Sequence, residues 1–250
     1  MIIPGKKVEA IFEKRLNRFV ARVDLKGGSI EVHVPNSGRL AELLVPGARV
    51  VLRETANRLR KYCYDLIMVY KDDILVSVDS MLPNKLMVVA LKESKDFFQQ
   101  DNYNWLCKTI KKIEGYDFVR SEVKFKDSRF DIGIGKNDAD GKKDSIKYYM
   151  EVKGVTLVEK KMALFPDAPT ERGTKHLLEL VEAKREGFGA GVCFVIQRED
   201  ADAFSPNDAM DTSFGRALRA AARAGVDVFA VRCRVELDNI ELMEAVKIIL

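Results

Sequence analysis

The sequence predicts a two-domain protein of the mixed α/β (α+β) class, with a small β-barrel in residues 1–82 and a mixed-sheet domain in residues 83–250. Three observations favour this organisation. The 250 residues are 47% hydrophobic, which is enough to bury one large core or two of ordinary size. The N-terminal third alternates short β-rich runs with turns. From about Pro83 onward, helical patterns alternate with strand patterns.

The N-terminal region contains five strand patterns and one short helical pattern. A Gly27-Gly28 turn between two β-rich runs is typical of a hairpin, and Lys71-Asp72-Asp73 marks the turn of a second one. The strand patterns cover residues 18–25, 29–34 and 48–55 and the hairpin over residues 64–80. Residues 35–44 open with Pro-Asn-Ser-Gly and predict a short helix. This combination predicts a Greek-key barrel of the OB type.

The C-terminal region predicts a three-stranded antiparallel unit between helices, followed by two further strands. The expected helices cover residues 84–97, 102–113, 173–187 and 213–225, and the expected strands cover residues 116–126, 128–135, 148–157, 189–197 and 226–236. Residues 136–147 are polar and predict a hairpin loop. In the helix over 173–187, we expect Thr174 to be the N-cap and Gly187 the C-cap. Its apolar side is expected to contain Leu177, Leu178, Leu180 and Val181.

Composition excludes several classes of protein. No apolar segment approaches the roughly 18 residues of a membrane span, and no signal-peptide pattern follows Met1, so we expect a cytoplasmic protein without membrane contact. The four cysteines are scattered and predict isolated thiols rather than a zinc site; they are Cys63, Cys107, Cys193 and Cys233. Residues 1–85 carry 15 Lys and Arg against 10 Asp and Glu. This excess of positive charge predicts an anionic partner, of which nucleic acid is the first candidate. The alternative is that the excess is a chance feature of a solvated surface.

Two charged residues interrupt a strand that otherwise has the pattern of a buried one. Glu151 and Lys153 in "YMEVKGV" share one face because side chains alternate along a strand. If the preceding strand forms a hairpin with this one, Asp131 is a cross-strand neighbour of Glu151, with Cβ atoms about 5 Å apart. Mg²⁺ or Mn²⁺ between the two carboxylates would relieve their repulsion. Lys153 could then stabilise charge developing on a phosphate or help to deprotonate the attacking water.

The spacing Asp131…Glu151-x-Lys153 resembles the signature of the PD-(D/E)XK nuclease superfamily. The alternative is a structural Glu–Lys pair at a sheet edge. Further motifs run in order along the chain: "HVPNSG", "RKY", "SEVKF", "SRFD", "EVKGVTLVE" and "FPDAPTERGTKHLLEL". Together they resemble the sugar fermentation stimulation protein A family. This resemblance implies an N-terminal OB-fold, a PD-(D/E)XK nuclease-like domain, DNA binding and a genetic link to maltose metabolism.

One departure from the family pattern concerns the metal site. Family members often carry Glu in the first helix of the second domain, in a context where this chain has Val89. Many nucleases of the superfamily use such a Glu to complete metal binding, so the departure puts catalysis in doubt. Glu122, in the strand next to Asp131, is a candidate substitute and is included with Asp131 and Glu151 as a predicted metal ligand. In the same superfamily, a polar residue at the end of the fourth strand often helps to position the attacking water. Gln197 is the candidate for this role here; the alternative is that Gln197 is an ordinary surface residue at a strand end.

Basic and aromatic residues suggest where nucleic acid would bind. Arg172, Lys175 and His176 lie near a helix N-terminus and are candidates for phosphate contacts, although His176 could instead be a packed histidine. On the barrel, charged and aromatic side chains are interleaved as in OB-folds that bind single strands; the candidates are Arg18, Arg39, Arg60, Lys61 and Tyr62. Phe19 is expected in the core.

Two functional hypotheses follow. The first is a DNA- or RNA-binding protein with a Mg²⁺- or Mn²⁺-dependent nuclease site formed by Asp131, Glu151 and Lys153. The second is a non-catalytic DNA-binding regulator of sugar metabolism whose nuclease-like domain has degenerated, as Val89 suggests. An enzyme acting on small phosphorylated sugars ranks last because the sequence has no phosphate loop or dinucleotide fingerprint. Whether the chain forms a homodimer is left open.

Overall fold

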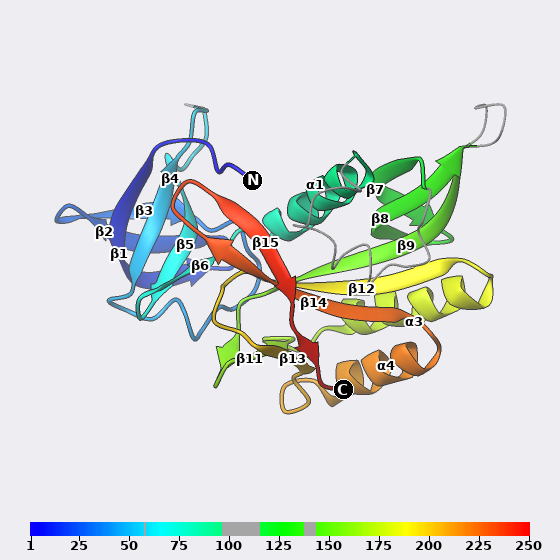
Figure 1. Ribbon diagram of the computed structural model, residues 1–250. Helices are drawn as coiled ribbons and strands as arrows, with labels where there is room; N and C mark the ends of the chain where they lie inside the picture. The colour runs from blue at the N-terminus through cyan, green and yellow to red at the C-terminus, as the bar shows by residue number, and fades with distance from the viewer. Residues whose placement is uncertain (58, 97–115, 138–143) are drawn as a thin grey trace.

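The computed structural model describes residues 1–57, 59–96, 116–137 and 144–250. Figure 1 shows the N-terminal strands gathered in a barrel on one side and a layered helix–sheet domain on the other. The predicted two-part architecture is confirmed. The predicted helix over residues 102–113, with Cys107, lies outside the described residues, as does the central part of the predicted loop over 136–147. No helix among the described residues is long and apolar enough to cross a membrane.

The barrel consists of six strands in the order β3-β2-β1-β4-β5-β6, and it closes where His33 of β3 pairs with Asp65 of β5. The strands are β1 (Lys7–Asn17), β2 (Val20–Leu25), β3 (Gly28–His33), β4 (Arg49–Glu54), β5 (Tyr64–Lys71) and β6 (Ile74–Ser77). Their inward-facing side chains form a core in which Phe12, Val23, Leu52 and Leu66 are at most 2% exposed. Alternating apolar residues along these strands therefore produce the closed sheet.

One strand of this region was missed, and two predictions are wrong. Strand β1 was not expected, because the helix-favouring composition of "KVEAIFEKRLN" conceals the alternation of Val8, Ala10 and Phe12. Residues 35–44 form a single turn, in which the amides of Leu43 and Leu44 donate to the Leu40 carbonyl, and not a helix. Phe19 is 49% exposed rather than in the core.

The C-terminal domain is built on a six-stranded sheet in the order β15-β14-β12-β9-β8-β7. Its strands are β7 (Phe118–Phe125), β8 (Ser128–Asn137), β9 (Asp144–Val155), β12 (Gly189–Ile196), β14 (Asp227–Val235) and β15 (Ile240–Ala245). Strands β7, β8 and β9 are antiparallel, whereas β9, β12 and β14 run parallel, as the long connections between them require. A small second sheet contains β10 (Val158–Glu159), β11 (Met162–Phe165), β13 (Ala203–Pro206) and β16 (Lys247–Ile248).

Helices cover both faces of the large sheet (Figure 1). They are α1 (Leu82–Asp96) on one face and α3 (Glu171–Arg185) and α4 (Thr212–Arg223) on the other. The core under α1 continues into the barrel, because Val51, Ile67 and Met68 pack with Leu82 and Leu86 in one buried cluster. The two domains are thus joined by a shared apolar core.

Helix α3 differs in detail from its prediction. Its N-cap is Thr170, whose hydroxyl accepts a hydrogen bond from the Gly173 amide, so the helix begins at Glu171. Its C-cap is Glu186, and Gly187 follows with a φ of 91°, a conformation that favours glycine. Leu178 is 57% exposed and does not belong to the buried side. The buried side instead includes His176.

Candidate metal and nucleic-acid site

The β8–β9 hairpin brings Asp131 and Glu151 together. Ile132 pairs with Met150 in this antiparallel register, so Asp131 of β8 lies beside Glu151 of β9. The Val152 backbone N–H donates to Asp131 Oδ2 at 2.8 Å, which ties the Asp131 carboxylate to β9. Two acidic residues therefore lie opposite each other on neighbouring strands of the sheet.

Both donors near Glu151 reach the same carboxylate oxygen. Lys153 Nζ donates to Glu151 Oε1 at 2.5 Å, and His176 Nδ1 of helix α3 contacts the same atom. Glu151 is only 2% exposed, and its other oxygen, Oε2, is buried without a hydrogen-bond partner among the described residues. A buried carboxylate oxygen without a partner is costly to maintain unless a cation or donor binds there.

Asp131 has a partner on α1 that the sequence analysis missed. Asn84 Nδ2 donates to Asp131 Oδ1 at 2.8 Å, so the first turn of the helix is connected to the acidic pair. Asn84 precedes Val89 by five residues. Val89, where the family resemblance predicted a glutamate, is half-buried. The side chain that α1 contributes here is therefore a neutral amide.

The two carboxylates have opposite pKa shifts. Burial raises the pKa of Asp131, and the negative charge of Glu151 raises it further. Burial also acts to raise the pKa of Glu151, but the hydrogen bond from His176 and the charge of Lys153 outweigh it and lower the pKa below its usual value. Glu151 is therefore ionised at neutral pH, and a nearby cation would favour ionisation of Asp131 as well.

The residues present fit a divalent cation held by two carboxylates. Mg²⁺ is commonly bound by one or two carboxylates, with water and substrate phosphates completing its coordination. Asp131 and the unpartnered Oε2 of Glu151 provide such a pair. In the described part of the chain, no group of three or more His, Cys, Asp or Glu is arranged to hold a metal. Glu122, the third predicted ligand, has a 72% exposed side chain that pairs with Arg129 at 3.3 Å.

The other predicted residues around the site have different surroundings. His176 is 6% exposed and contacts Glu151, so it lies inside the domain rather than where a phosphate contact was expected. Arg172 is exposed, and Lys175 forms an exposed ion pair with Glu179 at 3.6 Å. Gln197 is buried and donates to Ser77 Oγ and to the Asp79 carbonyl, at 3.2 and 3.1 Å. It therefore connects the sheet to the segment that joins the domains.

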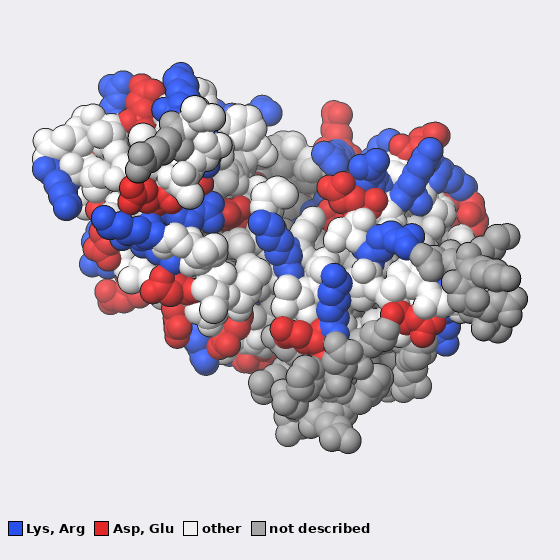
Figure 2. Space-filling model, turned by 90° about the horizontal axis from the view of Figure 1, so that it is seen from above, with Lys and Arg blue, Asp and Glu red and all other residues white. Residues whose placement is uncertain are grey.

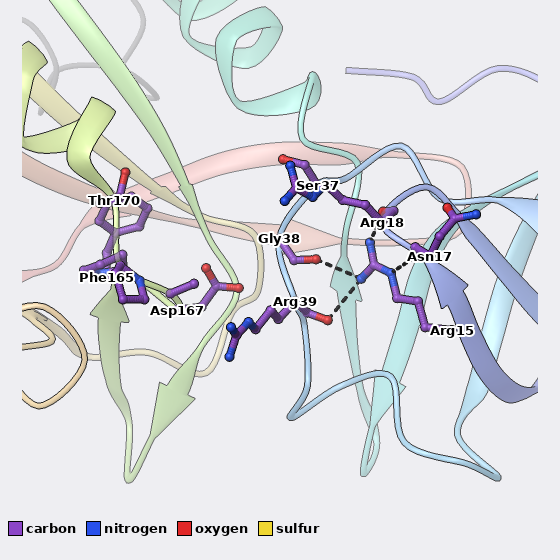
Figure 3. A pocket seen from close by; sticks show the side chains of 12 residues that line it. Arg15, Asn17, Arg18, Ser37, Gly38, Arg39, Phe165, Asp167 and Thr170 are labelled. Atoms are coloured by element: carbon purple, nitrogen blue, oxygen red, sulfur yellow. Dashed lines mark hydrogen bonds between the residues drawn. The ribbon is translucent and has the colours of Figure 1, made fainter.

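A groove of about 810 Å³ separates the barrel from the segment that precedes helix α3 (Figure 3). Arg18 and Arg39 line it on the barrel side, and Phe165, Asp167 and Thr170 line it on the other. The Arg18 and Arg39 side chains are exposed and have no ion-pair partner among the described residues. Both are therefore available to an anionic ligand in this groove.

Arg15, which sequence reasoning missed, holds the barrel wall of the groove in place. Its guanidinium donates to the carbonyls of Gly38 and Arg39 at 2.8 and 3.0 Å and to the carbonyls of Arg18 and Asn36 at 2.5 and 2.6 Å. Figure 3 shows this guanidinium pointing toward the loop that carries Gly38 and Arg39. All of these bonds go to backbone oxygens, so Arg15 fixes the loop that carries Arg39.

The remaining predicted barrel residues, Arg60, Lys61 and Tyr62, do not line the groove. Arg60 and Arg53 donate to Asp65, at 2.8 and 3.0 Å, and His33 Nδ1 lies 2.8 Å from the same carboxylate. Lys61 is exposed and lies over the Tyr62 ring, 5.0 Å from its centroid. In Figure 2, basic and acidic side chains are interspersed over the visible face of the barrel rather than forming one continuous basic patch.

Comparison with known proteins identifies both domains. Residues 14–78 match the model described as "SfsA N-terminal OB domain", and residues 81–239 match the model described as "Sugar fermentation stimulation protein RE domain". The fold and the site thus define an OB barrel joined to a restriction endonuclease-like, or nuclease-like, domain. The chain belongs to the sugar fermentation stimulation protein (SfsA) family.

Relatives match over nearly the full chain. A sugar fermentation stimulation protein homolog from Clostridium tetani is 46% identical over 250 residues, covering 100% of both chains. One from Acetivibrio thermocellus is 47% identical over 240 residues, covering 96% of this chain and 94% of its own. A solved structure, titled "The structure of Pyrococcus Furiosus SfsA in complex with Ca2+", has a TM-score of 0.81, covers 100% of this chain and 98% of its own, and is 24% identical. The last comparison concerns the fold.

Proposed function

We propose that this protein is a divalent-metal-dependent phosphodiesterase that acts on nucleic acid. The observation that carries the proposal is the buried Oε2 of Glu151, which has no partner among the described residues and belongs to the same acidic pair as Asp131. Carboxylate pairs of this kind occur where a cation is bound in contact with a phosphate. The nuclease-like domain that the family model describes is consistent with this chemistry.

Asp131 and Glu151 would hold the cation, which when bound would supply charge stabilisation at the scissile phosphate and help to ionise water. Lys153, whose side chain is 18% exposed, forms an ion pair with Glu151 and would stabilise the negative charge that develops on the phosphate. His176 acts on Glu151 rather than on the substrate. By bonding Oε1, it leaves Oε2 as the oxygen available to the metal.

Two further features support the proposal. The Pyrococcus furiosus relative was solved in complex with Ca²⁺, a cation that prefers the same oxygen ligands as Mg²⁺. Arg18 and Arg39 place unpaired positive charge in the groove between the domains, where it can neutralise backbone phosphates. We extend the proposal to DNA as the first substrate to test, with RNA as the second.

The test is a cleavage assay with purified protein, Mg²⁺ or Mn²⁺, and labelled single- and double-stranded DNA and RNA. The proposal expects cleavage that requires the metal, disappears in EDTA, and is lost in a Glu151→Gln variant. Cleavage of equal rate in both proteins would indicate a contaminating nuclease. Absence of cleavage on all four substrates with both metals would refute the catalytic role.

A second candidate function is favoured by Val89 and Asn84. With no glutamate at position 89 and a neutral amide bonded to Asp131, the domain could bind nucleic acid and a cation without cutting. Salt-dependent binding to DNA without cleavage would support this alternative. A Val89→Glu variant separates the two candidates further, since cleavage by the variant but not by the native chain would identify a degenerate catalytic site.

A further inference from the structure

A recess of about 160 Å³ lies at the domain junction. It shares Gly38, Phe165 and Asp167 with the arginine-lined groove, so the two hollows are adjacent. Gly154 lines it as well, and Gly154 directly follows Lys153 in strand β9. A ligand that occupied both hollows would therefore extend from the groove arginines to the C-terminal end of strand β9.

Two buried residues that line this recess carry a side-chain polar atom with no hydrogen-bond partner among the described residues. Gln197 is 1% exposed, and its amide nitrogen is used by Ser77 and Asp79, but its Oε1 has no partner among the described residues. Thr156 is 7% exposed, and its hydroxyl likewise has no partner in that part of the chain, since only its carbonyl accepts a bond, from Arg198. A side chain at Gly154 would place its Cβ 2.6 Å from Gln197 Oε1, so glycine keeps that acceptor open.

The chemistry of the recess matches a flat polar ring. Leu40, Leu164 and Phe165 supply apolar walls, while Gln197 Oε1 can accept a hydrogen bond and the Thr156 hydroxyl can donate or accept one. The volume would hold roughly ten water molecules, so it is much more than a single water site. Small ligand sites commonly combine apolar walls with a few such oriented polar groups.

We propose that this recess binds one unpaired nucleobase of a strand whose phosphates contact Arg18 and Arg39 in the groove. The inference rests on the proposed nucleic-acid function and specifies its substrate class. A base stacked in a duplex cannot enter a recess of this kind without leaving its stack, at a cost of a few kcal/mol. The substrate class is therefore single-stranded nucleic acid, or a duplex at a place where a base is unpaired.

The first experiment measures equilibrium binding by fluorescence anisotropy, in EDTA, to three probes of equal length. They are a labelled single strand, the same sequence as a blunt duplex, and a single strand in which every base is replaced by an abasic site. We expect the base-containing single strand to bind about tenfold tighter than the other two. Thr156→Val should weaken its binding about five- to tenfold, the usual effect of one lost hydrogen bond, and leave abasic binding unchanged.

The control variant is Thr212→Val, which alters an exposed threonine of helix α4 that does not line the recess. Its binding to all three probes should equal that of the native chain. Equal affinity of the native chain for the base-containing and abasic strands would overturn the inference and leave the proposed function standing. Failure of every probe to bind, both in EDTA and with Ca²⁺ added, would refute the proposed function itself.

A second experiment does not depend on the folding of a variant. The native chain, labelled with ¹⁵N, is titrated with deoxyadenosine monophosphate and separately with deoxyribose 5-phosphate. We expect the nucleotide to shift the backbone amides of Thr156, Leu157 and Gln197, and the sugar phosphate to leave them unchanged. Equal shifts with the sugar phosphate would show that the recess binds phosphate or sugar rather than a base, and would overturn the inference.

Discussion

Within the described residues, Asp65 of the barrel and Glu151 of the C-terminal domain are both buried acids, and their surroundings differ in how completely the negative charge is balanced. Asp65 in the barrel is 4% exposed and contacts Arg53, Arg60 and His33. Burial alone would raise its pKa, but the hydrogen bonds from these three side chains hold it at about 2. In the C-terminal domain, Glu151 leaves one oxygen without a partner, and Asp131 beside it has a raised pKa.

This difference separates a structural acid from a candidate functional one. In both clusters a charged residue interrupts an apolar strand, "YDLIMVYK" in one case and "YYMEVKGV" in the other. The barrel cluster has enough basic partners to be complete by itself. The C-terminal pair has two carboxylates and Lys153 as its nearby cation, so it remains incomplete until a further cation or donor binds. The distinguishing feature is the balance of partners, rather than burial.

Removing the charge of Glu151 is expected to have the largest effect on activity. Glu151→Gln should reduce metal-dependent cleavage by at least about 100-fold, because metal stabilisation of the transition state is worth several kcal/mol. The rate is measured by single-turnover cleavage of a labelled strand in Mn²⁺. Glu122→Gln is the matched control, since its carboxylate is exposed and paired with Arg129, and it should retain the native rate. A similar loss in both variants would show that the site includes Glu122.

Removing the charge of Asp65 should affect stability instead. Asp65→Asn should lower the free energy of unfolding by about 2 kcal/mol, less than for a fully buried pair because Arg53 and Arg60 are partly exposed. Urea unfolding of native and variant protein measures this difference. Cleavage, corrected for the folded fraction, should be unchanged. A loss of cleavage in a fully folded variant would contradict the structural role of this cluster.

The pH dependence of the same variant provides a further check. The folded pKa of Asp65 is depressed to about 2 from 3.8, so its contribution to stability is present above pH 3.8 and is lost as the pH falls toward 2. Native protein should therefore lose more stability between pH 4 and pH 2 than Asp65→Asn does. Parallel stability curves for the two proteins over this range would refute the assignment.

Replacing His176 should lower the affinity for the metal more than it lowers the stability of the domain. His176→Ala should weaken Mn²⁺ binding about tenfold, the lower end of the effect of losing a residue that orients a metal ligand. Isothermal titration measures the dissociation constant in the absence of substrate. His176→Asn, which retains a donor, should recover part of the affinity. Unchanged affinity in both variants would show that the histidine only fills space.

The smallest expected effect concerns the groove. Arg39→Ala should weaken binding to single strands a few-fold and reduce the slope of log affinity against log salt by about 0.7, the value for one phosphate contact. Lys126→Ala, on a surface where Lys126 pairs with Glu182 at 2.5 Å, should leave the slope unchanged. Equal slopes for native protein and Arg39→Ala would remove Arg39 from the binding surface.

Sequence reasoning predicted the fold better than the surroundings of the site. Alternation in the strands and the change of pattern near Pro83 were sufficient for the two domains, and the Glu151-x-Lys153 spacing was sufficient for the hairpin pair. Asn84 could not be found, because a polar residue in the first turn of a helix resembles an ordinary cap. The contact of His176 was partly predictable, since Gly173, His176, Leu177 and Leu180 share one helical face.

The remaining features depend on contacts between distant segments. The recess requires Thr156 and Gln197 to meet Leu40 of the barrel, and the groove requires the loop at Arg39 to face Asp167. No local sequence pattern predicts contacts between segments that lie this far apart in the chain. The same applies to Glu122, whose strand position suggested a metal ligand. Its φ of 52° and its exposed ion pair with Arg129 could not be read from the alternation of the strand.

The central claim is that Asp131 and Glu151 form an incomplete acidic pair that binds a divalent cation. Its most direct test is anomalous diffraction from crystals of the native protein soaked in Mn²⁺. The account predicts a peak in contact with the Asp131 carboxylate and with Glu151 Oε2, and no peak at this position in Glu151→Gln crystals. Manganese bound only at other positions would contradict this claim. So would crystals saturated with Mn²⁺ in which the metal is absent and a side chain contacts Glu151 Oε2.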